Sequence, residues 1–194
     1  MTGRAGIALV LLLAFSGLGC ARRDGPDRDC PPAADSAALV DPTLLAFLSL
    51  ARSAHHKADV KEEGQDLAGA IAELDALVRR RVPGAGAPAA EIREVLADTR
   101  ARLADLKSRQ GLFAEAEREI SSGLELAREP NYFRGHLFEV RGAVEERRAK
   151  SLEKAGSRAE AEQAKQRALE AFEEAIRIQA GVIERSLKPT DAPR

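Results

Sequence analysis

The chain has 194 residues, and its 30 Lys and Arg residues nearly balance its 31 Asp and Glu residues, which gives a net charge of −1. This balance argues against a dedicated nucleic-acid binder, which would carry a strong basic excess, and the length leaves little room for two full domains. Charged residues make up 31% of the chain and aromatic residues only 4%, a composition that favours packed amphipathic helices over a β-sandwich.

The first twenty residues predict export from the cytoplasm. Arg4 supplies a short positive region, the nine residues from Ile7 to Phe15 are apolar, and small residues follow. A helix that spans a bilayer needs about 20 apolar residues, so nine are too few to cross one. The segment is typical of a secretory signal peptide over residues 1–19, and it is excluded from fold reasoning.

The end of this segment makes the prediction more specific. Ser16 to Cys20 read SGLGC, which resembles the lipobox of bacterial lipoproteins; Gly19 fits the pattern, whereas Gly17 stands where the family usually has Leu. The resemblance implies a diacylglyceryl group on Cys20, and Ala21 after it implies the outer membrane, facing the periplasm. Two or three acyl chains would hold the protein stably at the membrane. The alternative is an ordinary secretory signal with an accidental cysteine.

Residues 20–40 predict a polar tether between the lipid and the folded part. The segment contains three prolines and alternating charges, and it lacks apolar periodicity until its end. If Cys20 carries lipid, Cys30 has no partner within the chain, so its thiol is either inert or forms an intermolecular disulfide.

From Asp41 onward, apolar residues at three- and four-residue spacing predict a helical domain over residues 41–187, followed by a polar tail over 188–194. Asp41 followed by Pro42 is typical of a helix start. Turn residues then divide the domain into about six antiparallel helices in three hairpins, an all-α fold. The dividing residues are Gly64, the loop from Pro83 to Pro88, Gly111, Pro130 and Gly156.

Residues 109–131, RQGLFAEAEREISSGLELAREPN, and the later QRALEAFEEAIRI resemble the tetratricopeptide repeat, a helix hairpin that stacks on its neighbours. Ala70, Ala116 and Ala168 are taken as equivalent small residues, each with a bulky core residue four positions later, Phe172 in the last case. Their spacing of 46 and 52 residues departs from the family's 34, and it implies about seven extra residues after Gly156. The alternative is an irregular six-helix bundle.

No constellation of residues predicts catalysis, a metal ion or a cofactor. His55 and His56 are adjacent, so on a helix they point about 100° apart and cannot chelate one ion from one face. The carboxylate pairs, such as Glu145 and Glu146, lie in segments rich in Arg and Lys, where a solvated face explains them. HExxH, GxSxG and phosphate-loop motifs are absent from the sequence. We therefore expect no enzyme, and no nucleic-acid partner.

What remains is a binding surface. In the repeat family, the first helix of each hairpin lines a groove that takes a peptide or partner helix. The resemblance, carried over by register, implies which residues of this chain face such a groove. In the first two hairpins the candidate groove residues are Arg52, His55, Asp59, Glu62, Glu63, Asp98, Ala101, Asp105, Ser108 and Arg109. In the third hairpin the resemblance implies that Glu146, Lys150 and Glu153 face the groove. The alternative is that all of these are ordinary solvated residues.

The sequence thus predicts a lipid-anchored protein of the bacterial cell envelope that acts as an adaptor between proteins. The family resemblance implies roles such as assistance in the assembly of an envelope or secretion complex. Its partner would be another envelope protein, and nothing in the residues selects one. The alternative is a structural spacer or self-associating subunit, a homo-oligomer held together by apolar residues near the end of the last helix, Val182, Ile183 and Leu187.

Overall fold

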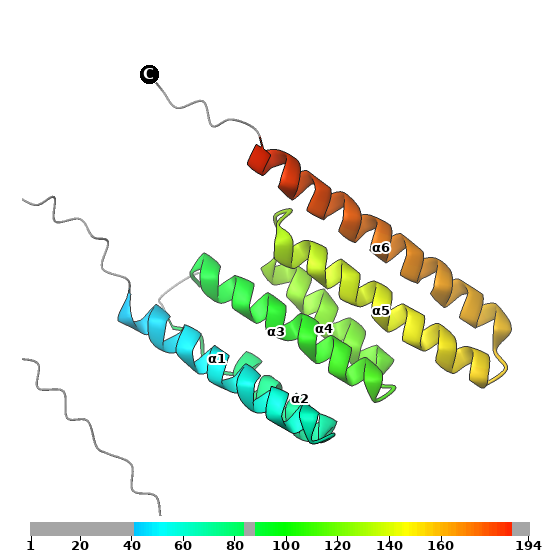
Figure 1. Ribbon diagram of the computed structural model, residues 1–194, viewed down its shortest axis with the longest axis horizontal. Helices are drawn as coiled ribbons and strands as arrows, with labels where there is room; N and C mark the ends of the chain where they lie inside the picture. Colours follow the sequence, from blue (N-terminus) through cyan, green and yellow to red (C-terminus); the bar gives the residue numbers. More distant parts are fainter. Residues whose placement is uncertain (1–40, 84–87, 188–194) are drawn as a thin grey trace, which may run out of the picture. The chain divides into compact units, whose positions relative to one another are not determined.

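A computed structural model describes residues 41–83 and 88–187 of the chain. These residues form six α-helices and no strand, which confirms the predicted all-α fold (Figure 1). The predicted signal peptide with Cys20, the tether and the tail lie outside the described residues. The helices are α1 (Pro42–Glu63), α2 (Leu67–Val78), α3 (Ala90–Arg109), α4 (Phe113–Leu126), α5 (Tyr132–Lys154) and α6 (Arg158–Leu187).

Polar side chains define where several helices begin. At α1 the carboxylate of Asp41 accepts a hydrogen bond of 2.8 Å from the backbone N–H of Thr43, with Pro42 as the first helical residue. Asp66 caps α2 and Asn131 caps α5 in the same way. Each cap satisfies one of the backbone N–H groups that have no partner within the helix, so these starts follow from local sequence.

The turn inside each hairpin has the same backbone geometry. Its central residue is left-handed, with φ of 62° at Gln65, 78° at Gly111 and 82° at Gly156. The next N–H then returns to a carbonyl five residues back, as from Leu112 to Lys107 at 3.0 Å. This is the geometry of a helix C-terminal cap. The turns lie 46 and 45 residues apart, so the repeat is nearly regular.

This regularity corrects the predicted equivalence of Ala168 and the predicted insertion after Gly156. Ala70 and Ala116 each follow their turn residue by five positions, and the residue five after Gly156 is Ala161; all three are fully buried. Ala168 matched by sequence because α6 repeats alanine along one face, where residues seven apart are nearly equivalent. The additional length of the third hairpin lies at the end of α6, which has 30 residues against 12 in α2 and 14 in α4.

The three hairpins stack in chain order. Within them α1 packs on α2, α3 on α4 and α5 on α6, while α3 also contacts both helices of the first hairpin and α5 both helices of the second (Figure 1). Each junction has its own apolar cluster. Leu74 of α2 packs with Leu103 and Leu106 of α3, and Ile120 of α4 packs with Leu137 and Val144 of α5. Burial of these fully enclosed side chains is the main attraction between hairpins.

The contact between α5 and α6 uses small residues instead. Gly135 and Gly142 of α5 are buried, and a Cβ atom at Gly142 would lie 2.6 Å from the Phe172 ring. The facing side of α6 is lined by buried alanines, which let the two backbones approach closely. These alanines are Ala161, Ala164, Ala168, Ala171 and Ala175.

Two apolar residues of α6 are not enclosed, one of them Phe172, which the sequence predicts as a core residue. Phe172 lies across Gly142 but is only half-buried, and Ile176 is 67% exposed. The buried isoleucine is Ile178. Positions two apart on a helix point about 200° apart, so only one of the two isoleucines can face α5.

Candidate functional site

The predicted groove residues meet where α1, α3 and α5 adjoin, and there they form a network that we call the polar ladder. It consists of His55, Asp59, Glu62, Thr99, Arg102, Asp105, Ser108, Arg109 and Arg147.

Arg102 of α3 forms the central connection of the ladder to α1. Its guanidinium donates to Asp59 Oδ1 at 2.5 Å and to Glu62 Oε2 at 3.2 Å, and also to the backbone carbonyl of His55 at 3.3 Å. Arg109 of α3 pairs with the other oxygen of Glu62. Two cations of α3 therefore hold two carboxylates that lie one helical turn apart on α1.

Arg147 extends the ladder from α3 to α5. It pairs with Asp105 at 2.7 Å and donates to the hydroxyl of Ser108 at 2.8 Å, while that hydroxyl donates to the backbone carbonyl of Asp105. The ladder therefore links the first helices of all three hairpins through charge-assisted hydrogen bonds.

His55 is held in one protonation state by its neighbours. The single hydroxyl proton of Thr99 is donated to the Val95 carbonyl at 2.7 Å, so Thr99 can only accept from His55 Nε2 at 2.9 Å. The other ring nitrogen faces Arg102 Nη1 at 3.4 Å and must carry a lone pair. Burial lowers the pKa of His55, and Arg102 lowers it further against the opposing charges of Asp98 and Asp59.

The Glu62 carboxylate is held in its charged form. Its hydrogen bond from Arg109 is the main cause that lowers its pKa, and Arg102 acts in the same direction. The ladder charges thus satisfy one another, which suits positioning and recognition. A catalytic nucleophile or base would need a reactive group left free for a substrate.

Beside the ladder lies a cavity of about 360 Å³ between α3, α5 and α6. Its apolar lining consists of Ala101, Val140, Ala143 and the ring of Phe172, and its polar lining of Arg102, Asp105, His136 and Glu139. The volume falls at the lower end of the range of ligand pockets, and the mixture of an apolar lining with a few polar groups is typical of them. The exposed ring of Tyr132 stacks on His136 with centroids 5.9 Å apart, at one edge of this site.

The structure brings together most of the predicted groove residues. His55, Asp59, Glu62, Asp105, Ser108 and Arg109 belong to the ladder, Ala101 lines the cavity, and Asp98 is close enough to influence the pKa of His55. Arg52 and Glu63 are exposed on α1, where Glu63 borders an acidic hollow with Asp59, Glu62 and Arg109.

In the third hairpin Glu146, Lys150 and Glu153 lie at the same distances in sequence from Gly156 as Ala101, Asp105 and Ser108 lie from Gly111. Lys150 pairs with Glu146 on the same helix, and Glu153 pairs with Lys165 of α6. The contact of α5 with α3 is made by Arg147, which lies nine residues before its turn, as Arg102 does. The arginine at this position therefore reaches the hairpin before its own, and among the described residues no hairpin follows α6 to pair with Lys150 and Glu153 in the same way.

Sequence reasoning also missed Thr99, Arg102 and the role of Phe172 in the cavity. Arg102 carries a signal, because it lies seven residues before Arg109, on the same face of α3. Nothing in the sequence marks Thr99 or Phe172 as site residues. Their roles depend on which helix lies opposite.

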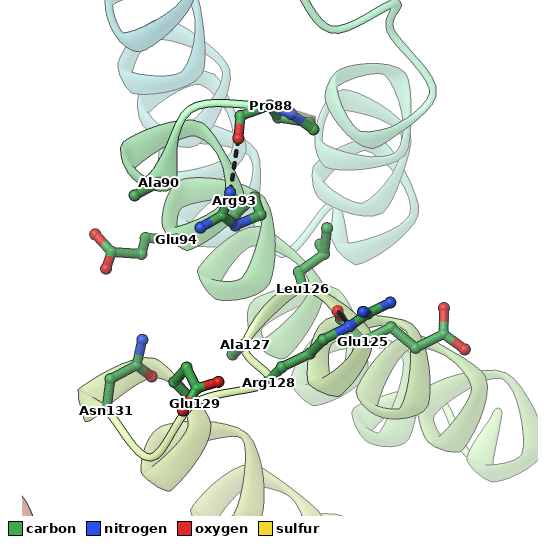
Figure 2. A pocket seen from close by; sticks show the side chains of 10 residues that line it. All are labelled: Pro88, Ala90, Arg93, Glu94, Glu125, Leu126, Ala127, Arg128, Glu129 and Asn131. Carbon is green, nitrogen blue, oxygen red and sulfur yellow. Dashed lines mark hydrogen bonds between the residues drawn. The ribbon is translucent and has the colours of Figure 1, made fainter. Parts of the chain in front are cut away.

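A second cavity, of about 460 Å³, lies where α3 begins and α4 ends (Figure 2). Arg93 donates to the Pro88 carbonyl at 2.7 Å across its edge, and side chains of both charges border it. Glu94, Arg128 and Asn131 do not converge on one point in Figure 2. This cavity lacks the convergent polar groups that would define a ligand.

The buried charges elsewhere have structural partners. Lys107 of α3 pairs with Glu119 of α4 at 2.7 Å, and Glu145 of α5 pairs with Arg167 of α6 at 2.8 Å. No group of His, Cys, Asp and Glu able to hold a metal ion occurs within residues 41–83 and 88–187. In the same ranges, no helix combines the length and hydropathy that a bilayer crossing requires.

Comparison of the chain with protein-family models, with curated proteins and with solved structures returned no match. The proposals for its function therefore rest on the sequence and on the geometry described above.

Proposed function

We propose that this protein is a lipid-anchored lipoprotein of the bacterial cell envelope that acts as an adaptor between proteins. A partner segment binds across the first helices of the hairpins, α1, α3 and α5. Three features support this proposal: the lipobox-like sequence ending at Cys20, the resemblance of residues 109–131 to the tetratricopeptide repeat, and the stacked hairpins themselves.

The cavity beside the ladder is the observation that carries the proposal. The half-buried ring of Phe172 and the neighbouring Val140 and Ala143 offer apolar surface next to rigidly paired charges. An apolar side chain of a partner inserted there would bury this surface, while the ladder pre-orders the polar rim at little entropic cost on binding.

The charge of the surface indicates the chemistry of the partner segment. Asp59, Glu62 and Glu63 border one hollow with a single cation, Arg109, which is already paired with Glu62. A segment that places a bulky apolar residue in the cavity and a Lys or Arg toward Glu63 would match both features. The lipid on Cys20 would concentrate this surface at the membrane, which raises the effective concentration toward an envelope partner.

The experiment is site-specific photo-crosslinking in cells of a bacterium that processes lipoproteins. A photoreactive residue replaces Glu139 at the rim of the cavity, and a matched control places it at Gln163, which is exposed on α6 away from the cavity. We expect one stoichiometric envelope protein crosslinked from position 139 and not from 163, with a reduced yield in a Cys20→Ala background.

A second variant separates loss of binding from loss of folding. Ala143→Phe fills the cavity, so it should abolish the crosslink while the helical content and the unfolding midpoint remain close to those of the parent chain. If no crosslinked partner is found from either position, the adaptor function is contradicted and the structural spacer is favoured. A crosslink to a second copy of this chain would favour the self-associating subunit.

A further inference from the structure

The second half of α6 carries an exposed apolar stripe, which we call the α6 stripe. Leu169, Ile176 and Ile183 lie seven residues apart on one face, and Leu187 continues it one turn later. Their exposed fractions are 57%, 67%, 58% and 76%. At 1.5 Å per residue these four residues span about 27 Å, and exposed apolar residues gathered on one helix face point to an interaction surface. Among the described helices α6 contacts α5 alone, so none of them covers the stripe.

The stripe lies on the same face of α6 as the surface on which the earlier hairpins stack. Counting from the turns, Leu169 occupies the thirteenth position, as Val78 and Leu124 do, and these two residues pack against the clusters at the junction with the next hairpin. Leu74 and Ile120 occupy the ninth position, where each is fully buried. The ninth position after Gly156 is Lys165, which is exposed and pairs with Glu153 and Glu162. A polar residue at this position is typical of a terminal repeat, and beyond it the stacking face of α6 carries apolar residues that none of the described helices covers.

Acidic side chains border the stripe on both sides. Glu173 and Glu184 are exposed on the flank away from α5, and neither forms an ion pair within residues 41–83 and 88–187. On the α5 side, Glu139 is exposed and contacts only His136 as a charged partner among the described residues. Of the nearby cations, Arg177 is already paired with Glu174 and Arg185 donates to the Pro130 carbonyl. The stripe thus has a negative border.

This border disfavours a second copy of the chain as the occupant. If two copies packed their α6 stripes together in antiparallel orientation, each flank of one helix would lie against the same flank of the other. Glu173 and Glu184 of one copy would then face Glu173 and Glu184 of the other. A parallel pair would bring them toward α5 of the other copy, where Glu139 is exposed. Like charges placed together oppose association and select against a wrong partner.

We propose that the α6 stripe binds an amphipathic helix of a protein partner. The partner helix presents apolar residues at three- and four-residue spacing to the stripe and carries Lys or Arg along the edge that meets Glu173 and Glu184. This is recognition of a helix by its apolar face, with the charged edges setting orientation and partner choice. The four residues of the stripe are distinct from those that line the cavity beside the ladder, and Glu139 lies beside both surfaces.

The test uses two synthetic 20-residue helical peptides with the same leucine face, one with Lys and one with Glu at the flanking positions. Binding to the full chain in phosphatidylcholine nanodiscs is followed by fluorescence anisotropy, with empty nanodiscs as the blank. We expect the Lys peptide to bind about tenfold more tightly than the Glu peptide at low salt, with a smaller difference at high salt. The double variant Glu173→Lys/Glu184→Lys should reverse the preference.

Two further variants complete the test. Ile176→Ser/Ile183→Ser changes only exposed residues and should abolish binding of both peptides without changing the unfolding midpoint, whereas Gln163→Ser on the far side of α6 should change neither. Equal binding of the two peptides, or binding that survives Ile176→Ser/Ile183→Ser, would overturn the proposal. Sedimentation that shows a dimer abolished by the same double variant would assign the stripe to a second copy instead.

Discussion

Gln65 occupies the left-handed position that glycine occupies in the other two hairpin turns. Its φ is 62°, and a side chain in this region costs about 1 kcal/mol relative to glycine. We therefore predict that Gln65→Gly raises the free energy of unfolding by about 1 kcal/mol, as measured by urea denaturation. Gly111→Gln should lower it by a similar amount, because a Cβ atom at Gly111 meets no other atom within 4 Å and only the backbone is strained. A change of the same sign in both variants would contradict this explanation.

The environment of His55 predicts a loss of stability in mildly acidic solution. Because burial holds its pKa in the folded state below the unfolded value of about 6.5, the unfolded chain binds more protons between these two values. The free energy of unfolding should therefore be unaffected by His55 above pH 7, and should fall as the pH drops below 6.5 toward the folded pKa. Protonation would place a proton on the nitrogen that faces Arg102.

The adjacent histidine gives a matched control for this prediction. His55→Gln should flatten the dependence of stability on pH between 5 and 7, whereas His56→Gln, at an exposed position, should leave it unchanged. Glu62 contributes at lower pH: its lowered pKa adds stability above the unfolded value near 4.3, which is lost as the pH falls through the folded pKa. Equal slopes in the two histidine variants would show that His55 is not the titrating group.

At the scale of the secondary-structure element, α5 and α6 depend on glycine at their closest approach. A Cβ atom at Gly142 would lie 2.6 Å from the Phe172 ring, so Gly142→Ala should destabilise the protein by about 1–3 kcal/mol through displacement of that ring. Gly181 of α6 has room for an added methyl group, because a Cβ atom built there would have Arg185 Nη1 as its nearest neighbour, at 3.6 Å. Gly181→Ala should therefore stabilise α6 by about 0.5–1 kcal/mol.

Urea denaturation of the two glycine variants separates packing from helix propensity. Propensity alone would make both substitutions stabilising, so opposite signs are the expected result. Because Phe172 also lines the cavity beside the ladder, Gly142→Ala should alter the crosslink from position 139 as well. Stabilisation by Gly142→Ala would indicate that the ring moves aside freely, which would contradict the close contact of α5 and α6.

The six helices and their starts were largely predictable at this scale because their determinants are local. Asp41 with Pro42, Gly111 and Gly156 act within a few residues of themselves, and the structure confirms a helix boundary at each. The register of α6 was not predictable. Its alanine-rich face matches the repeat equally well at Ala161 and Ala168, and only the positions of the turns select the first.

At the scale of the described helical stack, each hairpin depends on its nearest neighbour. The first hairpin contacts the rest of the stack only through α3, and Arg102 provides the central polar link. We predict that Arg102→Met increases amide hydrogen exchange in α1 and α2 by an amount equivalent to about 1 kcal/mol, while α5 and α6 remain unchanged.

The control for this prediction is Arg118→Met, which changes an exposed arginine of α4. It should leave exchange unchanged in all six helices. An equal increase throughout the described helices after Arg102→Met would mean that the hairpins unfold as one unit, and that the ladder is not a local link between the first two.

The sequence by itself determined the all-α class, most helix boundaries and one side of the candidate site. The class and the boundaries depend on periodicity, caps and turns, which act over one or two helical turns. The register carried over from the tetratricopeptide resemblance predicted Asp59, Glu62 and Asp105 as groove residues, and the structure brings these three into the ladder. Only the tertiary structure decided that Arg102 and Arg147 join this face, that Phe172 lines a cavity, and that Ile176 is exposed. Those features depend on which side of each helix meets a neighbour. A rotation of one residue changes that side by about 100°, and no local interaction opposes such a rotation.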